Sequence, residues 1–373
     1  MKNWRIILVW SVAVSLLWGC STDVELNAPY KPFTIVFGVL DPGLDTQYVR
    51  INKTWLGDGN NLEYAVIRDS SEYDYDEFVA TIGKYNNGNL QEEWTLDSIT
   101  RYDKDTDGIF FGPAYSAYYF VPENGLDQSE DVEYRLNIDF DSKDPVSAVS
   151  NVVDFPTNNS NILQPPPGVS SYTLNLANVT ELGSHYNNFV FKWNSSPNSG
   201  RYEISLNFHY TENVWEDDLH TQLVSSTQKV INWSIGSATA PTDGVAQLTK
   251  EVNWEAFYRM LSNRLEADTK ITREAGIWDA EEQVLGVFDL ILTIGNDELS
   301  TFLEVNEPVT GIIQERPEYT NITNGLGLFA SRGQQIVEGL GISNNSIQEL
   351  VEGDITFQLN FCSNNPFSEY ACD

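Results

Sequence analysis

Three aspartates at alternate positions, Asp103, Asp105 and Asp107, form the pattern that most directly implies metal chemistry. Carboxylates at this spacing can converge on one hard cation, and the glycine that follows them, Gly108, permits the sharp bend of a calcium loop. The full motif also needs a bidentate glutamate at its end, where this chain has Ala114. An acidic turn is therefore the favoured interpretation, and a calcium site is the alternative.

Other patterns that can carry a reaction are incomplete in this chain. Gly325-Leu326-Gly327-Leu328-Phe329-Ala330 matches a dinucleotide fingerprint, but it follows turn residues, so we interpret it as a structural turn with glycines at positive φ. No histidine has a metal-binding spacing, and no G-x-S-x-G elbow is present. With 54 acidic residues, acidic pairs are expected by chance. We therefore expect no cofactor, no resident metal and no catalytic residues; the histidines are His185, His209 and His220.

Cys20 implies a different chemistry. It ends the segment Leu16-Leu17-Trp18-Gly19-Cys20, in which a small residue stands directly before a cysteine, as in a lipobox. In that chemistry the thiol receives a diacylglyceryl group, the chain is cut before the cysteine, and the freed amine takes a further acyl chain. Two or three acyl chains hold a protein stably on a membrane, whereas one binds only marginally. The sequence therefore predicts lipidation at Cys20, and a plain secretory signal is the alternative.

The segment before Cys20 supports this prediction. Residues 6–18 carry no charge and follow a front end with two cations and no acid. Crossing a bilayer needs about 20 apolar residues in a helix, so this run is too short and has the form of a signal peptide, residues 1–19. The acidic segment 20–29 is expected to act as a tether. We predict no membrane-spanning helix after the signal.

The chain is strongly acidic, with 21 basic and 54 acidic residues and a formal net charge of −33. This balance excludes nucleic acid as a partner, because its binding depends on cations that neutralise phosphates. An anionic membrane would also repel the folded part, so acyl chains would have to hold it there. Solubility is the favoured explanation of the acidity, with a bound cation or a basic partner as the alternative. The acidic and aromatic run 69–77 is interpreted as a solvated loop, and alternatively as a recognition surface.

Two further cysteines, Cys362 and Cys372, form an even pair in an exported chain. An oxidising compartment favours a disulfide between them. The short loop that it closes would contribute about 3 kcal/mol on the chain-entropy model.

Alternating and β-branched runs predict a mainly β protein. Several short strands with turn residues between them favour a β-sandwich over residues 30–156. The run Pro165-Pro166-Pro167-Gly168 indicates a semi-rigid linker at 157–170. The strands are expected at 33–40, 48–55, 78–82, 109–111, 115–120 and 133–140.

Residues 171–373 are expected to form a second β-sandwich-like domain. A strand at 189–193, a polar turn and an alternating strand at 201–208 resemble the fibronectin type III and immunoglobulin pattern. Strands are also expected at 287–294 and 299–305. One amphipathic helix, capped by Asn253, is expected to pack on a sheet through an apolar stripe. The stripe consists of Trp254, Phe257, Tyr258, Leu261 and Leu265.

Three segments of the chain resemble a family of Bacteroidota outer-membrane lipoproteins known only as a domain of unknown function. The first is the strand pair 37–40 and 48–53, the second is 208–212, and the most specific is 316–332, which reads RPEYTNITNGLGLFASR. The family looks like β-sandwich proteins that are often encoded beside TonB-dependent receptors, which implies an outer-membrane location. The tether residues 21–25 are similar to the acidic signal that sends lipoproteins of this phylum to the cell surface. The family offers no catalytic residues to transfer.

The lipid anchor, the two β domains and the missing catalytic set together predict a non-enzymatic protein. We expect it to bind an unidentified ligand, or to serve a TonB-dependent outer-membrane transporter as an accessory subunit. A secreted glycan or peptide hydrolase and an adhesion or envelope-assembly component are the alternatives.

Overall fold

The computed structural model describes residues 32–55, 60–105, 107–156, 158–169, 172–241, 245–281, 283–307 and 318–372. Cys20, the signal peptide 1–19 and the tether 20–29 lie outside these residues. The protein is mainly β, with 49% of the chain in strands and 13% in helices, which confirms the expected fold class.

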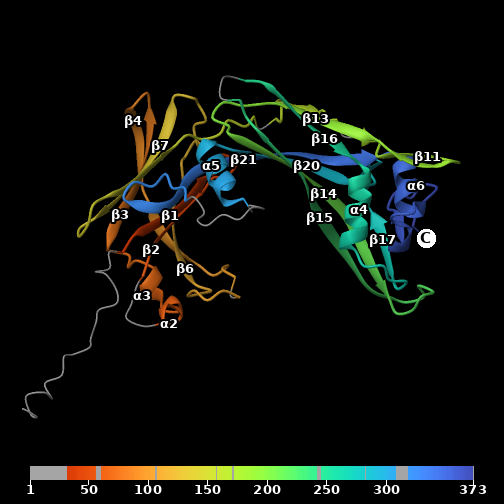
Figure 1. Cartoon of the computed structure of the whole chain (residues 1–373), viewed down its shortest axis with the longest axis horizontal. Helices are drawn as coiled ribbons and strands as arrows, with labels where there is room; N and C mark the ends of the chain where they lie inside the picture. The colour runs from red at the N-terminus through yellow and green to blue at the C-terminus, as the bar shows by residue number, and fades with distance from the viewer. Residues whose placement is uncertain are drawn as a thin grey trace, which may run out of the picture.

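One sheet of 11 strands runs through both lobes of the molecule (Figure 1). Its main path runs β22-β17-β14-β20-β21-β1-β2-β6-β5, with β15 beside β14 and β10 beside β21. The strands are β1 (Thr34–Leu40), β2 (Gln47–Lys53), β5 (Asp97–Arg101), β6 (Tyr115–Phe120), β10 (Thr173–Leu174), β14 (Arg201–Trp215), β15 (Leu223–Thr239), β17 (Ile271–Ala275), β20 (Phe288–Gly295), β21 (Gly325–Ile342) and β22 (Phe361–Ser363).

The first lobe is a sandwich of two sheets. Its second sheet has the order β4-β3-β7-β8, made of β3 (Phe78–Asn86), β4 (Asn89–Thr95), β7 (Val132–Phe140) and β8 (Val146–Ser150). Alternate residues of each strand face the layer between the sheets, because successive side chains of a strand point to opposite faces. In β1 and β2 these inward residues include Val36, Val49 and Ile51, all essentially without solvent exposure.

The second lobe surrounds a larger core. The helix α4 (Glu255–Arg264) packs there with three fully buried side chains of the expected stripe, Phe257, Tyr258 and Leu261. Trp254, also fully buried, is the N-cap residue, and the Asn253 side chain accepts the Glu255 N–H at 3.0 Å. Three small sheets complete this lobe, β16-β13-β9, β11-β12 and β18-β19: β9 (Ile162–Gln164), β11 (Ala177–Thr180), β12 (Gly183–Tyr186), β13 (Asn188–Asn194), β16 (Gln247–Asn253), β18 (Ile277–Asp279) and β19 (Val284–Gly286).

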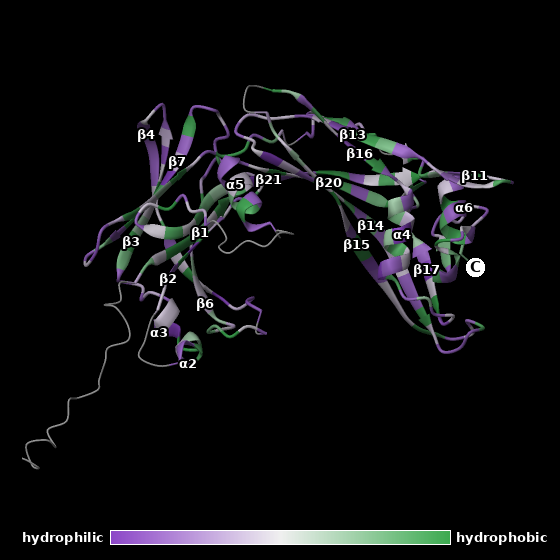
Figure 2. Cartoon of the chain, in the orientation of Figure 1, coloured by the Kyte–Doolittle hydropathy of each residue, from purple (hydrophilic) through white to green (hydrophobic). Residues whose placement is uncertain are grey.

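The structure adds helices that the sequence interpretation missed. The segment expected as a strand at 299–305 lies in α5 (Asp297–Asn306), because Asn296 caps it by accepting the Leu299 N–H and two acids follow in the first turn. The others are α2 (Asn61–Ala65), α3 (Arg68–Ser71), α6 (Asn344–Glu352) and a 3₁₀ turn (Phe357–Leu359). Figure 2 shows apolar residues on α4 and the inner strands, between more polar loops.

The expected strand at 109–111 is also absent. The Phe111 N–H donates instead to the Ala65 carbonyl at 2.8 Å, and the Lys104 ammonium donates to the Phe111 carbonyl. These groups are therefore bonded outside any sheet, and the segment lies in a loop between β5 and β6.

The boundary between the two cores differs from the expected one. Val152 belongs to the first core and Val153 to the second, so the chain crosses before the expected linker 157–170. That linker is no exposed spacer, because Ile162 in β9 is buried in the second core. Late residues return to the first core, where Ile322 and Phe329 are buried. The first lobe is therefore discontinuous in sequence, and residues 171–373 do not form a separate unit.

Candidate functional site

Basic side chains gather at one pocket of the first lobe. The pocket has a volume of about 300 Å³, and its lining includes three cations and no carboxylate. In a chain with a net charge of −33, such a concentration of positive charge is the feature that most needs a functional explanation. The lining residues are Ile35, Phe37, Arg50, Asn52, Lys53, Ser71, Lys104 and Phe110.

Two neighbouring strands, β1 and β2, supply five of the eight lining residues. Phe37 of β1 lies opposite Arg50 of β2, and Ile35 lies opposite Asn52, so the four side chains form two cross-strand pairs. They share the outer face of the sheet because the alternate residues of both strands fill the core. The Arg50 guanidinium also donates to the Asn52 side-chain oxygen at 2.9 Å.

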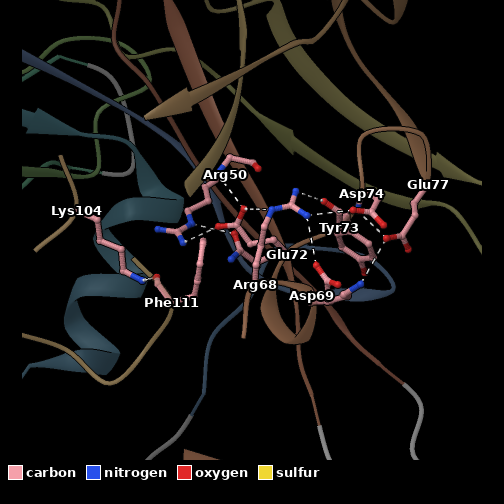
Figure 3. A network of polar contacts seen from close by, with 12 residues as sticks. Arg50, Arg68, Asp69, Glu72, Tyr73, Asp74, Glu77, Lys104 and Phe111 are labelled. Atoms are coloured by element: carbon pink, nitrogen blue, oxygen red, sulfur yellow. Dashed lines mark hydrogen bonds and ion pairs between the residues drawn. The ribbon is translucent and has the colours of Figure 1, made fainter. Parts of the chain in front are cut away.

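A buried carboxylate, Glu72, lies beside the pocket, near Arg50 of its lining and near Arg68 (Figure 3). It is 4% exposed and accepts the Ser116 N–H at 3.0 Å. Arg50 lies 3.8 Å from one of its oxygens and Arg68 lies 4.0 Å from the other. An isolated antiparallel β-bridge between the backbones of Asn52 and Glu72 holds the segment that carries Glu72 against β2. The interpretation of residues 69–77 as a solvated loop is therefore wrong for its central residues.

Tyr73 forms the second buried element of that run, and it is also 4% exposed. Its hydroxyl lies 2.9 Å from the Thr34 hydroxyl, and the Lys143 ammonium donates to both groups. The ammonium groups of Lys53 and Lys143 lie 5.0 and 4.7 Å from the centre of the Tyr73 ring. Cation–π attraction therefore helps to hold Lys53 of the pocket lining and one further cation, Lys143, around Tyr73.

Lys104 reaches the pocket from the loop between β5 and β6. Its ammonium lies 5.9 Å from the centre of the Phe110 ring. Burial lowers the pKa of Lys104, and the nearby Arg50 charge lowers it further, while Glu72 opposes the shift. Of these effects on the pKa, the repulsion from Arg50 is the one that a bound anion would offset.

Two of the three candidate calcium ligands, Asp103 and Asp105, accept hydrogen bonds from other groups of the protein. Arg101 holds the Asp103 carboxylate in an ion pair, and the Tyr115 hydroxyl donates to it at 3.1 Å. The pKa of Asp103 lies well below its usual value, mainly because Arg101 donates to it. Asp105 accepts the Asp107 N–H at 3.0 Å, which is an acidic turn. Within the described residues, no three His, Cys, Asp or Glu side chains form a group that could hold a metal.

The glycine-rich segment is a strand and not a turn. Residues 325–330 begin β21 and pair in parallel with β1, so the segment lacks the strand-to-helix turn of a dinucleotide site. Gly327 does have a positive φ of 115°, as expected for a glycine in a strained position. Its backbone leaves no room for a side chain, since a Cβ would lie 2.0 Å from the Val36 carbonyl oxygen.

The histidines belong to three separate local structures. The His209 ring lies 2.6 Å from the Asp289 carboxylate, and the His220 ring lies 2.7 Å from the Thr269 carbonyl. His185 lies in the β11-β12 hairpin. The predicted disulfide between Cys362 and Cys372 is present, and it ties the carboxyl end to β22.

The sequence interpretation missed every residue of the basic pocket. Arg50 and Lys53 lie in a strand that was correctly predicted, but Lys104 lies far along the chain. The only local signal was the presence of two cations, Arg50 and Lys53, on one strand of an acidic chain. Nothing in the sequence indicates that the 101–114 loop returns to that strand.

The chain matches no known protein family, and no curated protein matches it. A solved C-terminal globular domain of an oligosaccharyltransferase from Pyrococcus abyssi matches with 11% identity and a TM-score of 0.18, over 67% of this chain and 48% of that one. A Bacteroides uniformis β-glucuronidase matches with 9% identity and a TM-score of 0.13, over 78% of this chain and 26% of that one. The chain thus spans about half the length of the first structure and a quarter of the second. Likenesses this slight carry no argument about fold or function.

Within the described residues, no helix combines the length and the apolar character that crossing a bilayer requires.

Proposed function

We propose that this protein is an exported lipoprotein, anchored through Cys20, that binds an anionic ligand at the basic pocket. The observation that carries the proposal is the lining of this pocket, three cations without a carboxylate in a chain of net charge −33. Arginine and lysine in a partly desolvated pocket recognise carboxylates and phosphates through charge-assisted hydrogen bonds. The protein acts by binding and not by catalysis.

The walls of the pocket define the rest of the ligand. Ile35, Phe37 and Phe110 provide apolar surface beside the cations. A ligand that combines an anionic group with an apolar part would satisfy both, since binding pockets commonly join apolar walls with a few charged groups. The ligand class is therefore an amphiphilic carboxylate or phosphate.

Binding of octyl phosphate, measured by isothermal titration calorimetry, tests the pocket. We expect the double variant Arg50→Gln, Lys104→Gln to bind octyl phosphate at least about tenfold more weakly, because charged hydrogen bonds contribute about 1.5–3 kcal/mol each. The matched control is Arg259→Gln, Lys270→Gln in the second lobe, which should leave the affinity unchanged. Equal affinity for octyltrimethylammonium, which has the same tail and the opposite charge, would refute an anion site.

Membrane fractionation tests the anchor. Cys20→Ser should move the protein out of the membrane fraction, because no acyl chain can then be attached, whereas Ser21→Ala should not. Undiminished membrane retention of Cys20→Ser would contradict lipidation at this residue.

The partner that we propose is a TonB-dependent outer-membrane transporter. The resemblance to outer-membrane lipoproteins encoded beside such receptors and the acidic segment 21–25 support this role. Gentle detergent extraction of outer membranes should recover the two proteins together. Recovery of the lipoprotein alone would count against a stable transporter complex.

A further inference from the structure

A group of large apolar side chains is exposed at the end of the first lobe that carries α2 and α3. All six members are at least 46% exposed, and Phe110 is 61% exposed. We call them the apolar end patch; they are Trp55, Leu62, Val66, Ile67, Ile109 and Phe110.

The segments that carry the patch are bound to one another. The Phe111 N–H donates to the Ala65 carbonyl at 2.8 Å, which joins the loop with Ile109 and Phe110 to α2. The Trp55 ring lies 5.7 Å from that of Tyr64 in the same helix. Figure 2 shows apolar residues on α2 at the outer end of the lobe. The patch is therefore one surface built from α2 and its neighbours.

The helix α2 makes this surface unusual. It has five residues, and none of their side chains is buried. Helices in proteins are stabilised chiefly by packing an apolar face, and contiguous apolar surface on a soluble domain marks an interaction site. Leu62 and Val66 lie four residues apart, which places them on one side of the turn.

The path of the chain places the patch beside the segment that leads to Cys20. The Phe33 N–H donates to the Thr54 hydroxyl and the Thr54 N–H donates to the Phe33 carbonyl, both at 2.9 Å. The segment that leads from Cys20 therefore joins the fold directly beside Trp55. The 13 residues from Cys20 to Phe33 reach at most roughly 45 Å when fully extended. An acyl anchor on Cys20 thus keeps this end of the molecule near the bilayer.

We propose that the apolar end patch docks on the surface of the bilayer that holds the anchor. This inference rests on the proposed lipidation of Cys20. Apolar side chains insert into the boundary between headgroups and acyl chains, and attachment grows with the apolar area buried. Lys104 lies beside Phe110 of the patch and Arg68 follows Ile67, but the acids Glu63 and Asp69 are also close along the chain. Apolar contact therefore carries the docking, on zwitterionic as well as anionic bilayers.

Site-directed spin labelling of the lipidated full-length protein in phosphatidylcholine vesicles tests the docking. Cys362 and Cys372 are joined in a disulfide and Cys20 carries lipid, so a single added cysteine takes the label. Nitroxides at Leu62→Cys and Phe110→Cys should collide severalfold less with a water-soluble nickel chelate than a nitroxide at Leu219→Cys. Leu219 is 83% exposed and lies in the second lobe, so it is the matched control.

The outcomes separate this inference from the proposed function. If the protein stays in the supernatant when the vesicles are sedimented, it does not bind them. This result would refute the anchor, and with it the basis of the docking. A protein that sediments with vesicles while all three labels meet nickel equally retains the anchor and refutes the docking. Shielding that develops only when outer-membrane proteins are added overturns the bilayer as the occupant in favour of a protein partner.

Discussion

At the scale of single residues, the buried carboxylate of Glu72 organises the basic pocket. It lies within 4.0 Å of both Arg50 and Arg68, whose side chains are about one-third exposed. A buried charge needs partners and hydrogen bonds to offset its lost hydration, and here the Ser116 N–H supplies one. Glu72 thus stabilises the fold while it neutralises part of the charge that a ligand would meet.

Glu72→Gln should therefore change stability and binding in opposite directions. We expect the free energy of unfolding to fall by about 1–3 kcal/mol, because the charged hydrogen bond to Ser116 is weakened and Arg50 and Arg68 lose a nearby carboxylate. The affinity for octyl phosphate should rise, because a negative charge beside the pocket is gone. Urea unfolding and calorimetry measure the two effects.

The control for this prediction is Glu255→Gln. Glu255 pairs with Arg259 on the exposed surface of α4, so its loss should cost less than about 1 kcal/mol. Equal costs for the two variants, or weaker octyl phosphate binding by Glu72→Gln, would contradict the role assigned to Glu72.

At the scale of elements, the parallel contact between β1 and β21 joins the first strand of the described chain to one of its last. Thr34 lies opposite Gly325 and Leu40 opposite Ser331. Gly327 allows this close approach, since a side chain there would meet the Val36 carbonyl. Gly339 also has a positive φ on β21, yet nothing lies within 4 Å of a Cβ built on it.

Alanine substitutions at these two glycines distinguish the cost of a steric clash from the cost of backbone strain. Gly339→Ala should lower the free energy of unfolding by about 1–2 kcal/mol, the cost of a positive φ for alanine. Gly327→Ala should lower it by more than about 3 kcal/mol, because strain and displacement of β21 from β1 add. Urea unfolding of the two variants compares them directly, and equal losses would refute the clash.

Asp289 joins three adjacent strands of the second lobe. It lies on β20, accepts from His209 on β14 and accepts the Gly339 N–H of β21 at 3.0 Å. Burial raises the pKa of Asp289, but the His209 and Gly339 hydrogen bonds outweigh burial, so the pKa lies below its usual value. The ionised form is therefore favoured in the folded state.

The stability that Asp289 contributes should depend on pH. A depressed carboxylate pKa stabilises the fold above the unfolded pKa of about 3.9, and this contribution is lost as pH falls through the folded pKa. Asp289→Asn should thus lower the free energy of unfolding by about 1–3 kcal/mol near neutral pH. The difference from the unmodified protein should shrink below about pH 4. A difference that stays constant in urea unfolding across this range would argue against the ionised pair.

At the scale of the whole molecule, one strand serves two cores. Phe329 of β21 is fully buried in the first core, and Leu340 of the same strand is buried in the second. The lobes are therefore linked by a continuous sheet and not by a spacer (Figure 1).

Two truncations on β21 should act on different lobes. Phe329→Ala should cost about 3–5 kcal/mol and speed amide hydrogen exchange most in β3 and β7. Leu340→Ala should cost about 2–5 kcal/mol and speed exchange most in β14 and β20. If Phe329→Ala left the amides of β3 and β7 unchanged, the discontinuous first lobe would be refuted.

Local patterns along the chain predicted much of the secondary structure. The alternating residues of β1, β2 and β7 and the apolar stripe of α4 are properties of neighbours in sequence, and the structure confirms them. The pattern failed at 299–305, where the cap at Asn296 outweighed a β-prone composition. It also failed at the centre of the run 69–77, where Glu72 and Tyr73 are buried and Glu72 lies near Arg50 of β2.

By itself, the sequence determined the strand-rich class, the alternation of β2, the apolar stripe of α4 and the pairing of Cys362 with Cys372. These depend on side-chain period and on residues close along the chain. Only the tertiary structure decided that residues 320–331 complete the first core. It alone brought Lys104 to Arg50 and Lys53. Such contacts depend on which distant segments pack together, and no local pattern of residues records that choice.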